Sequence, residues 1–429
     1  MDDQEIKALM ERYREPAIML HRPYPPNKLP KTNSWLGGLP ALPGGMEWPR
    51  NNDDVPLHFL AQIDCSELPP NGGALPDAGI LFFFACIDEE LAWAYESDQQ
   101  GNCRVIHAPA AGVAPTPAPG GLPPIMGGWA GYERDFMLPG DAAFNIYPRW
   151  PILAHPVQSW PDGSALPRNI WAAAGHEDHS AWREAVNQGR EEQSARVATP
   201  LSGSSNAQPD PAAEGRPAYL PSEQDPPFPQ AWVMVDRIAR RIANNVRRTM
   251  EMEARRRAAP SDSRDSSRLQ PVYDVAVKWV EAAAAKGLDT APSDEARTLF
   301  TDWLKSLSEA GSSLSGISLS TSVRAGMGSA IQFAAESPSV AARIPEPYYT
   351  EFRSGLWRVS SIYHQMLGNA KATQEAAPVE RDEILLLYLM SDYGVDFMFC
   401  DVGEFEFWIK KKDLAARRFD RVRGATAGG

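Results

Sequence analysis

The sequence has few cysteines, four in 429 residues, at positions 65, 86, 103 and 400. None of them forms a Cys-x-x-Cys pair, so neither a disulfide framework nor a zinc knuckle is indicated, and a reducing compartment fits this usage. The phosphate-binding P-loop, the His-Glu-x-x-His zinc motif, the nucleophile elbow of serine hydrolases and a complete dinucleotide-binding glycine motif are also missing. We therefore expect no cofactor, and whether the protein is an enzyme stays open.

Long apolar runs and an export signal are missing as well. The first fifteen residues carry charges throughout, so they lack the uninterrupted apolar stretch of a secretory signal. The longest uncharged stretch, residues 105–132, is interrupted by prolines and glycines and predicts no membrane span. Together with the cysteine usage, these absences predict a cytoplasmic protein.

Positive charge is scarce, because 42 Lys and Arg against 55 Asp and Glu give a net charge of -13. An acidic field argues against broad nucleic-acid binding, which needs clustered Lys and Arg, but it suits a basic protein partner. One segment, residues 229–258, is the exception, with eight arginines against three acids. This segment either offers a surface to an anionic lipid or nucleic acid, or, as we favour, rests against acids of its own chain.

Three composition regimes divide the chain. Residues 1–170 are rich in Pro, Gly, Trp and Phe, with short apolar runs bounded by turn residues, which is typical of strands and loops. Residues 171–345 are rich in Ala, Arg, Glu and Ser and largely helical in pattern, apart from a Pro- and Ser-rich linker at about 199–229 that we expect to be disordered. Residues 346–429 return to strands. We therefore predict one β-rich domain, 1–170 and 346–429, split by a helical insertion.

Apolar spacing predicts helices within and just after the insertion. Residues 232–257 carry apolar side chains three or four apart, and further helices are expected at 272–286 and at 293–309, with Ser293 as the N-cap. Residues 311–330 are rich in Ser and Gly and predict a loop or a helix packed through small residues. A last helix candidate covers residues 348–367.

One pattern occurs near both ends of the chain. An apolar strand ends near an Asp, a connection follows, and an Asp-x-Gly sequence opens a second strand. The first copy is residues 60–64 and 77–84, and the second is residues 387–392 and 401–408. The first copy is apolar on both faces, whereas the second alternates Phe405 and Phe407 with Glu404 and Glu406, which predicts one solvated face. Two copies indicate an internal duplication whose halves bracket the insertion.

Several motifs overlap or flank these two copies. They are SWLGGLPALP at 34–43, EWP at 47–49, FLAQID at 59–64, HQMLG at 364–368 and DVG at 401–403. Together they resemble the YwqG-like proteins, a bacterial family catalogued as a domain of unknown function. The resemblance covers residues 15–165 and 345–425. It implies an α+β fold in which two similar, mostly antiparallel sheet units intertwine, and it implies no activity; the helical insertion has no counterpart in short members.

Four acids occupy matching places in the two copies: Asp64, Asp77, Asp392 and Asp401. Paired carboxylates can hold a divalent cation or divide acid and base roles, and His364 lies close to the second copy in sequence. The simpler interpretation is that each Asp caps a turn beside its Gly. A His176–His179 pair at a helix start has metal-binding spacing but no third ligand, so we expect no metal site.

One loop could line a groove, because it carries the glycine pair Gly37–Gly38 and the aromatic rings of Trp35 and Trp48. The alternative is that the glycines form a tight turn and the tryptophans pack in the core. The candidate binding residues from sequence are Trp35, Gly37, Gly38, Trp48, Gln62, Asp64, His364, Gln365, Asp392 and Asp401.

Two functions remain open at this point. The first is a module that binds a protein or peptide partner, in regulation or in neutralising a toxin, which fits the acidic balance, the Trp-bearing loops and the missing catalytic motifs. The alternative is a metal-assisted hydrolase or transferase that uses Asp64 and Asp392 with His364. The oligomeric state is not indicated.

Overall fold

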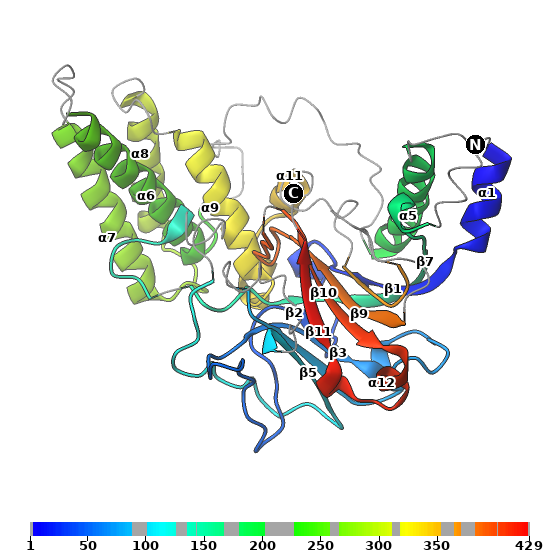
Figure 1. The fold of residues 1–429 in the computed structure, drawn as a ribbon. Helices are drawn as coiled ribbons and strands as arrows, with labels where there is room; N and C mark the ends of the chain where they lie inside the picture. The colour runs from blue at the N-terminus through cyan, green and yellow to red at the C-terminus, as the bar shows by residue number, and fades with distance from the viewer. Residues whose placement is uncertain are drawn as a thin grey trace.

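The computed structural model describes residues 3–87, 101–125, 135–142, 144–166, 180–201, 227–257, 266–310, 318–352, 364–369, 382–400 and 402–427. Over these ranges the chain forms nine α-helices and two antiparallel sheets (Figure 1). This confirms the predicted α+β class.

The larger sheet joins the two ends of the chain. Its strands, in spatial order, are β11 (Arg423–Ala427), β10 (Glu404–Lys410), β9 (Glu383–Met390), β8 (His364–Met366), β1 (Glu15–His21) and β7 (Leu153–Ser159). Strand β1 pairs antiparallel with β7 on one side and with β8 on the other. The N-terminal strand is therefore an interior strand of a sheet whose other half comes from the C-terminus.

The smaller sheet repeats the strand order of the larger one. It runs β5 (Cys103–Ala108), β4 (Ile80–Ala85), β3 (His58–Asp64), β2 (Trp35–Leu36) and β6 (Trp150–Pro151). In each sheet four consecutive strands form a meander, and a strand from elsewhere in the chain pairs with its first member: β6 with β2, and β1 with β8. The β3–β4 and β9–β10 pairs each contain one register shift. The expectation of two similar, intertwined halves is confirmed.

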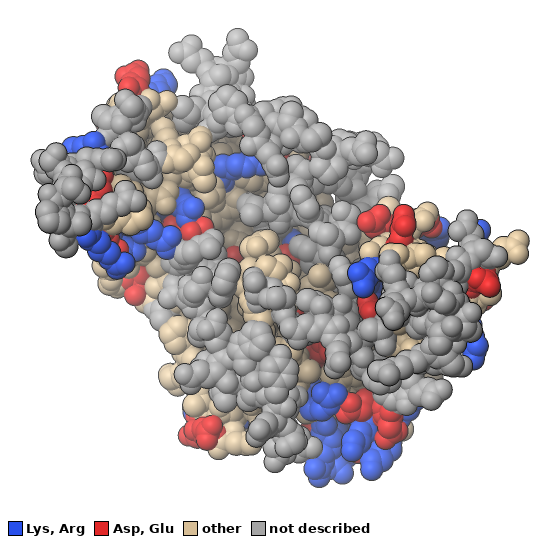
Figure 2. All heavy atoms as spheres, turned by 45° about the horizontal axis from the view of Figure 1, so that its top comes forward, with Lys and Arg blue, Asp and Glu red and all other residues tan. Residues whose placement is uncertain are grey.

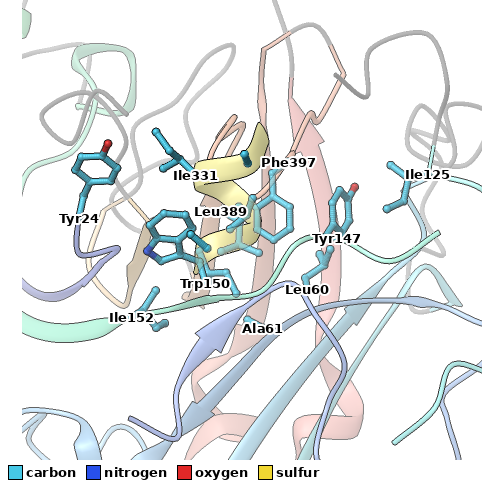
Figure 3. Close-up of a cluster of buried hydrophobic side chains, with 14 of the residues drawn as sticks. Tyr24, Leu60, Ala61, Ile125, Tyr147, Trp150, Ile152, Ile331, Leu389 and Phe397 are labelled. Carbon is cyan, nitrogen blue, oxygen red and sulfur yellow. The ribbon is translucent and has the colours of Figure 1, made fainter. Parts of the chain in front are cut away.

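The main core lies between the two sheets and extends to the helices. Phe83 of β4 and Phe407 of β10 meet edge to face with ring centroids 5.2 Å apart. Figure 3 shows where the layers converge: Leu60 and Ala61 of β3 and Leu389 of β9 lie near Tyr147, Trp150, Phe397 and Ile331. Successive strand residues normally point to opposite faces, but β3 has a register shift between Phe59 and Ala61, and the neighbours Leu60 and Ala61 both join this core.

The outer faces of the sheets are covered as well. The outward side chains of β4, Ile80, Phe82 and Phe84, form a second cluster with the Trp-bearing loop, as predicted for a copy that is apolar on both faces. The solvated face predicted for β10 is wrong. Glu404 is only 1% exposed, and half-buried Glu406 accepts a hydrogen bond from Trp408 Nε1 at 2.8 Å, so other parts of the chain cover this face too.

The helices α6 (Trp232–Arg257), α7 (Gln270–Lys286) and α8 (Asp294–Ala310) confirm three predicted helices, and Ser293 Oγ accepts the Ala296 N–H at the start of α8. Helix α9 (Leu319–Ala334) packs closely on α6: a Cβ on Gly326 would lie 2.7 Å from Ile238 Cα. Of the two alternatives for residues 311–330, a helix packed through small residues is therefore correct for 319–330. Residues 311–317 lie outside the described ranges.

The remaining helices are α1 (Asp3–Arg12), α5 (Ser180–Leu201), α10 (Pro338–Arg343), α11 (Glu346–Phe352) and α12 (Lys411–Ala415). The helix expected over 348–367 is wrong at its end, because residues 364–366 form β8, buried between β1 and β9. Sheet pairing there overrides local preference. Of the linker expected at 199–229, residues 202–226 lie outside the described part. The domain boundaries near 170 and 345 stay predictions.

The arginines of α6 pair with acids of the same chain. Arg240 Nη1 lies 2.5 Å from Asp141 Oδ2, and Arg241 pairs with Asp135. On the face of the molecule in Figure 2, Lys and Arg likewise gather beside Asp and Glu in mixed clusters. These pairs support the interpretation that the basic helix rests against acids of its own chain. Among the described helices, none has the length and apolarity to cross a membrane.

Candidate functional site

Two of the sequence-predicted residues meet in a buried charged network. Asp392 follows β9, and its carboxylate accepts hydrogen bonds from Arg22 Nε at 2.7 Å and Arg22 Nη2 at 2.9 Å. His364, the first residue of β8, places Nε2 3.2 Å from Asp392 Oδ2. Arg22 directly follows β1 and also lies over the Trp150 ring, 4.9 Å from its centroid. We call Arg22, His364 and Asp392 the buried triad.

The backbone fixes the orientation of each member of the triad. The Met390 N–H donates to His364 Nδ1 at 3.2 Å, and because a backbone N–H only donates, the imidazole proton is left on Nε2, facing Asp392. Asp392 Oδ1 also accepts the Gly394 N–H at 2.7 Å and so caps the turn after β9. Helix α9 secures the same turn, because Gln332 Nε2 donates to the carbonyls of Tyr393 and Gly394 at 3.0 and 3.1 Å.

The triad is closed to solvent. The side chains of Arg22, Asp392 and His364 are 4%, 0% and 1% exposed. Burial by itself raises the pKa of Asp392, but Arg22 and His364 outweigh it and hold that pKa well below its usual value. Within the described ranges, no group of three or more His, Cys, Asp or Glu is placed to hold a metal ion. A carboxylate that is permanently charged, ion-paired and shielded from water is suited to fixing structure.

Next to the triad lies a second buried acid that sequence reasoning missed. Burial raises the pKa of Asp396 to about 7, and the nearby Asp392 carboxylate adds to the effect. Asp396 Oδ2 is buried and finds no hydrogen-bond partner in the described part of the chain, and the same holds for the Tyr147 hydroxyl, whose pKa is raised by burial and by Asp396. No local motif marks these residues, because their burial comes from tertiary packing.

The acids of the first copy do not join the triad. Asp64 caps the short 3₁₀-helix η2 (Cys65–Glu67), where its Oδ1 accepts hydrogen bonds from Ser66 N and Ser66 Oγ at 2.9 and 2.6 Å. Its Oδ2 accepts from Asn33 Nδ2 at 3.1 Å. Asp77 is exposed. Asp401, like His176 and His179, lies outside the described residues.

The other candidate binding residues hold loops against the sheets. Gln62 accepts the Ala41 N–H and donates to the Asn33 carbonyl, and buried Gln365 donates to the carbonyls of Leu367 and Asn369. Trp48 Nε1 donates to the Leu57 carbonyl at 2.8 Å. Gly37 has φ +62°, and a Cβ there would lie 2.1 Å from the Pro148 carbonyl oxygen, so only glycine fits. Gly38 donates its N–H to the Tyr147 carbonyl.

An accessible pocket lies elsewhere, between the 3₁₀-helix η1 (Pro26–Lys28) and the helices α9 and α10. Its volume is about 640 Å³. Prolines and alanines make up much of its wall, together with Asn27, Leu29, Lys31, Thr32, Asn33, Glu67 and Arg149. Several lining residues are exposed, among them Lys31 and Ala342. We call this the η1–α10 pocket. No sequence pattern predicted it, because its walls come from segments about 300 positions apart.

Arg149 connects this pocket to one of the predicted residues. Its guanidinium carbon lies over the Trp35 ring, 4.1 Å from the centroid. Trp35 itself is only 6% exposed and does not line the pocket. The burial of Trp35 agrees with the core-packing alternative, and it is the stacked Arg149 that lines the pocket.

The fold and these sites can be set beside known proteins. A family model described as a domain of unknown function (DUF1963) matches residues 34–425, so the chain belongs to this family. The match runs from the loop before β2 into β11 and so includes both meanders and the helices between them. A comparison with curated proteins finds no match.

Breaking the triad from either side should destabilise the protein strongly. Removing one member of a buried ion pair leaves an unpaired charge, so Arg22→Met and Asp392→Asn should each lower the free energy of unfolding by about 3–5 kcal/mol. In urea unfolding, the double variant should lose at least about 1 kcal/mol less than the sum of the single losses. The exposed pair Arg14–Glu11 serves as control, and Arg14→Met should lower the free energy of unfolding by less than about 1 kcal/mol. If the losses of Arg22→Met and Asp392→Asn simply add in the double variant, the two residues are not directly coupled.

Asp396 should make stability depend on pH between about 4 and 7. Because its folded-state pKa lies above the unfolded value of ~4, the native state keeps a proton that the unfolded chain has released. The free energy of unfolding therefore falls as pH rises through this window. In urea unfolding over a pH series, Asp396→Asn should remove this slope and raise stability at pH 8 by roughly 2–4 kcal/mol.

Asp54→Asn is the matched control for this measurement, because Asp54 also has a positive φ, 62° against 53° at Asp396, but is exposed. It should leave the pH dependence unchanged. An unaltered slope in Asp396→Asn would show that Asp396 does not titrate in this range.

Proposed function

We propose that the protein is a binding module that recognises a protein or peptide partner, in regulation or in neutralising a toxin. The observation that carries this proposal is the η1–α10 pocket of about 640 Å³. Its volume falls in the usual range of roughly 300–1,000 Å³ for ligand sites, and its wall combines apolar surface with a few polar groups, as such sites do. A short peptide segment is the partner that fits these dimensions.

The pocket lies where the helices of the predicted insertion meet the β-rich part. Lys28 of η1 pairs with Glu346 of α11 at 3.0 Å, and Tyr24 donates from its hydroxyl to the Tyr349 carbonyl at 2.8 Å. These contacts hold η1 against the helical region. A preformed wall of this kind favours binding, because little order has to be gained when the ligand arrives.

The alternative of a metal-assisted hydrolase or transferase draws less support. His364 and Asp392 do lie together, as that mechanism requires, but Arg22 neutralises the carboxylate and all three side chains are shielded from solvent. Asp64 bonds to Ser66 and Asn33 instead of to the triad. A general base or metal ligand needs contact with the substrate or the ion, which this arrangement does not offer.

We further propose that the family relation is to the YwqG-like proteins and that the protein acts in the cytoplasm. The motifs at residues 34–43 and 364–368 support the first point. The second is supported by Cys65, Cys86, Cys103 and Cys400, which are all free thiols in the structure.

Peptide selection tests the proposed function. A displayed library of random peptides is selected on the full chain, and the enriched peptides are measured by fluorescence anisotropy against the wild type and Ala342→Trp. Ala342 is exposed and lines the pocket, so a Trp there fills the pocket without disturbing the core, and affinity should fall at least about tenfold.

The matched control is Ser339→Trp, an exposed position on the same helix that does not line the pocket, which should bind as the wild type does. The proposal fails if no peptide is enriched, or if the enriched peptides bind Ala342→Trp as tightly as Ser339→Trp.

A further inference from the structure

The Arg149 guanidinium forms no salt bridge in the described part of the chain. In the described part of the chain no carboxylate lies within salt-bridge distance of its guanidinium, and its Nε is buried without a hydrogen-bond partner. Glu336 accepts a hydrogen bond from the Arg149 backbone N–H at 2.5 Å and attracts the guanidinium only from beyond salt-bridge distance. Burial lowers the pKa of Arg149, which shows that the charge is kept in a partly desolvated place. Keeping a charge partly out of water costs free energy unless a ligand pairs with it.

Trp35 holds this cation in position. The guanidinium stacks on the indole at 4.1 Å, and the ring is fixed by its place in β2, paired with β3 and β6. Stacking leaves the edge of the guanidinium plane, where its N–H donors lie, for other partners. A flat fork of this kind matches the two oxygens of a carboxylate.

The charges of the pocket wall indicate how much negative charge it accepts. Lys31 and Arg149 are the two cations of the lining, and Lys31 has no ion pair within the described ranges. Glu67 is the one acid among the lining residues that the structure describes. Its oxygens are already occupied by Thr32 Oγ1, Ser34 Oγ and the Asn33 N–H, at 2.5, 2.6 and 2.8 Å. The described lining residues alone carry a net charge of +1, and Glu336, just outside the lining, adds one negative charge beside Arg149, so the two cations suit a single carboxylate better than a more highly charged group.

We propose that the η1–α10 pocket binds a carboxylate group of its ligand through Arg149, with Lys31 adding attraction across the pocket. This inference rests on the proposed function and specifies it: the peptide partner presents an acidic side chain or a C-terminal carboxylate. A phosphate group, with a charge near −2, is disfavoured by the fixed Glu67 carboxylate in the same wall.

The test uses matched small molecules and a signal from Trp35. Each fragment is prepared as an aryl carboxylate, its carboxamide and its phosphonate, so that shape is held constant while charge varies. The full chain is labelled with 5-fluorotryptophan, and the Trp35 resonance among the 13 tryptophans is assigned from Trp35→Phe. Carboxylates should shift this ¹⁹F resonance with saturation, because they change the charge stacked on the ring, and carboxamides and phosphonates should bind at least about tenfold more weakly.

Three variants separate charge from geometry. Arg149→Gln should weaken carboxylate binding about tenfold or more, and Arg149→Lys should restore only part of it, because Lys lacks the planar fork. Lys28→Gln removes a nearby cation of η1 that pairs with Glu346 and does not line the pocket, so it should change affinity less than about twofold. Thermal unfolding of each variant confirms that it is folded.

Any of four results would overturn the inference. The carboxylate and carboxamide could bind equally well, the phosphonate could bind more tightly, or no fragment could bind at all. The fourth is an Arg149→Gln variant that binds carboxylates with wild-type affinity. Peptides that bind in the pocket with no dependence on a carboxylate or on Arg149 would leave the proposed function standing while removing this inference. Absence of both fragment and peptide binding would remove the two together.

Discussion

The ion pair between Arg22 and Asp392 is the contact on which the arrangement of the chain most depends. The two residues are 370 positions apart in sequence and their side chains are 4% and 0% exposed. Arg22 extends from the end of β1, and Asp392 caps the turn after β9, so the pair fixes the N-terminal strand against the C-terminal meander. Two charges taken out of water are tolerable only because they satisfy each other, and this makes the register of β1 specific as well as stable.

The helices depend on the same turn. Gln332 of α9 donates to the carbonyls of Tyr393 and Gly394, directly beside Asp392, so the helical region is docked on the segment that the ion pair orders. Helix α9 is in turn packed on α6 through Gly326. The η1–α10 pocket opens where α9 and α10 face η1, only a few residues after Arg22. The accessible pocket therefore lies between η1, which follows Arg22 in sequence, and the helices that dock beside Asp392.

Sequence patterns predicted much of this fold, since many of its determinants are local. The apolar stripe of residues 232–257 defined α6, and the Asp-x-Gly repeats marked the two meanders. The prediction failed where tertiary contacts decide. Residues 364–366 continue a helical pattern yet pair as β8 between two strands that are distant in sequence, and the acidic face of β10 is covered by other parts of the chain. For the site, Asp392 and His364 were found because they lie in motifs, whereas Arg22, Asp396 and Arg149 acquire their environments only through folding.

Native-state hydrogen exchange of the full chain tests the central claim most directly, because it reports which strands open together. If the two ends of the chain form one cooperative unit around the triad, amides of β1, β7 and β9 will exchange with a common free energy of opening that falls along one line as urea is added. If β1 opens in a separate step of lower free energy while β9 stays protected, the N-terminal strand is an appendage, and the account of an interlocked domain is contradicted.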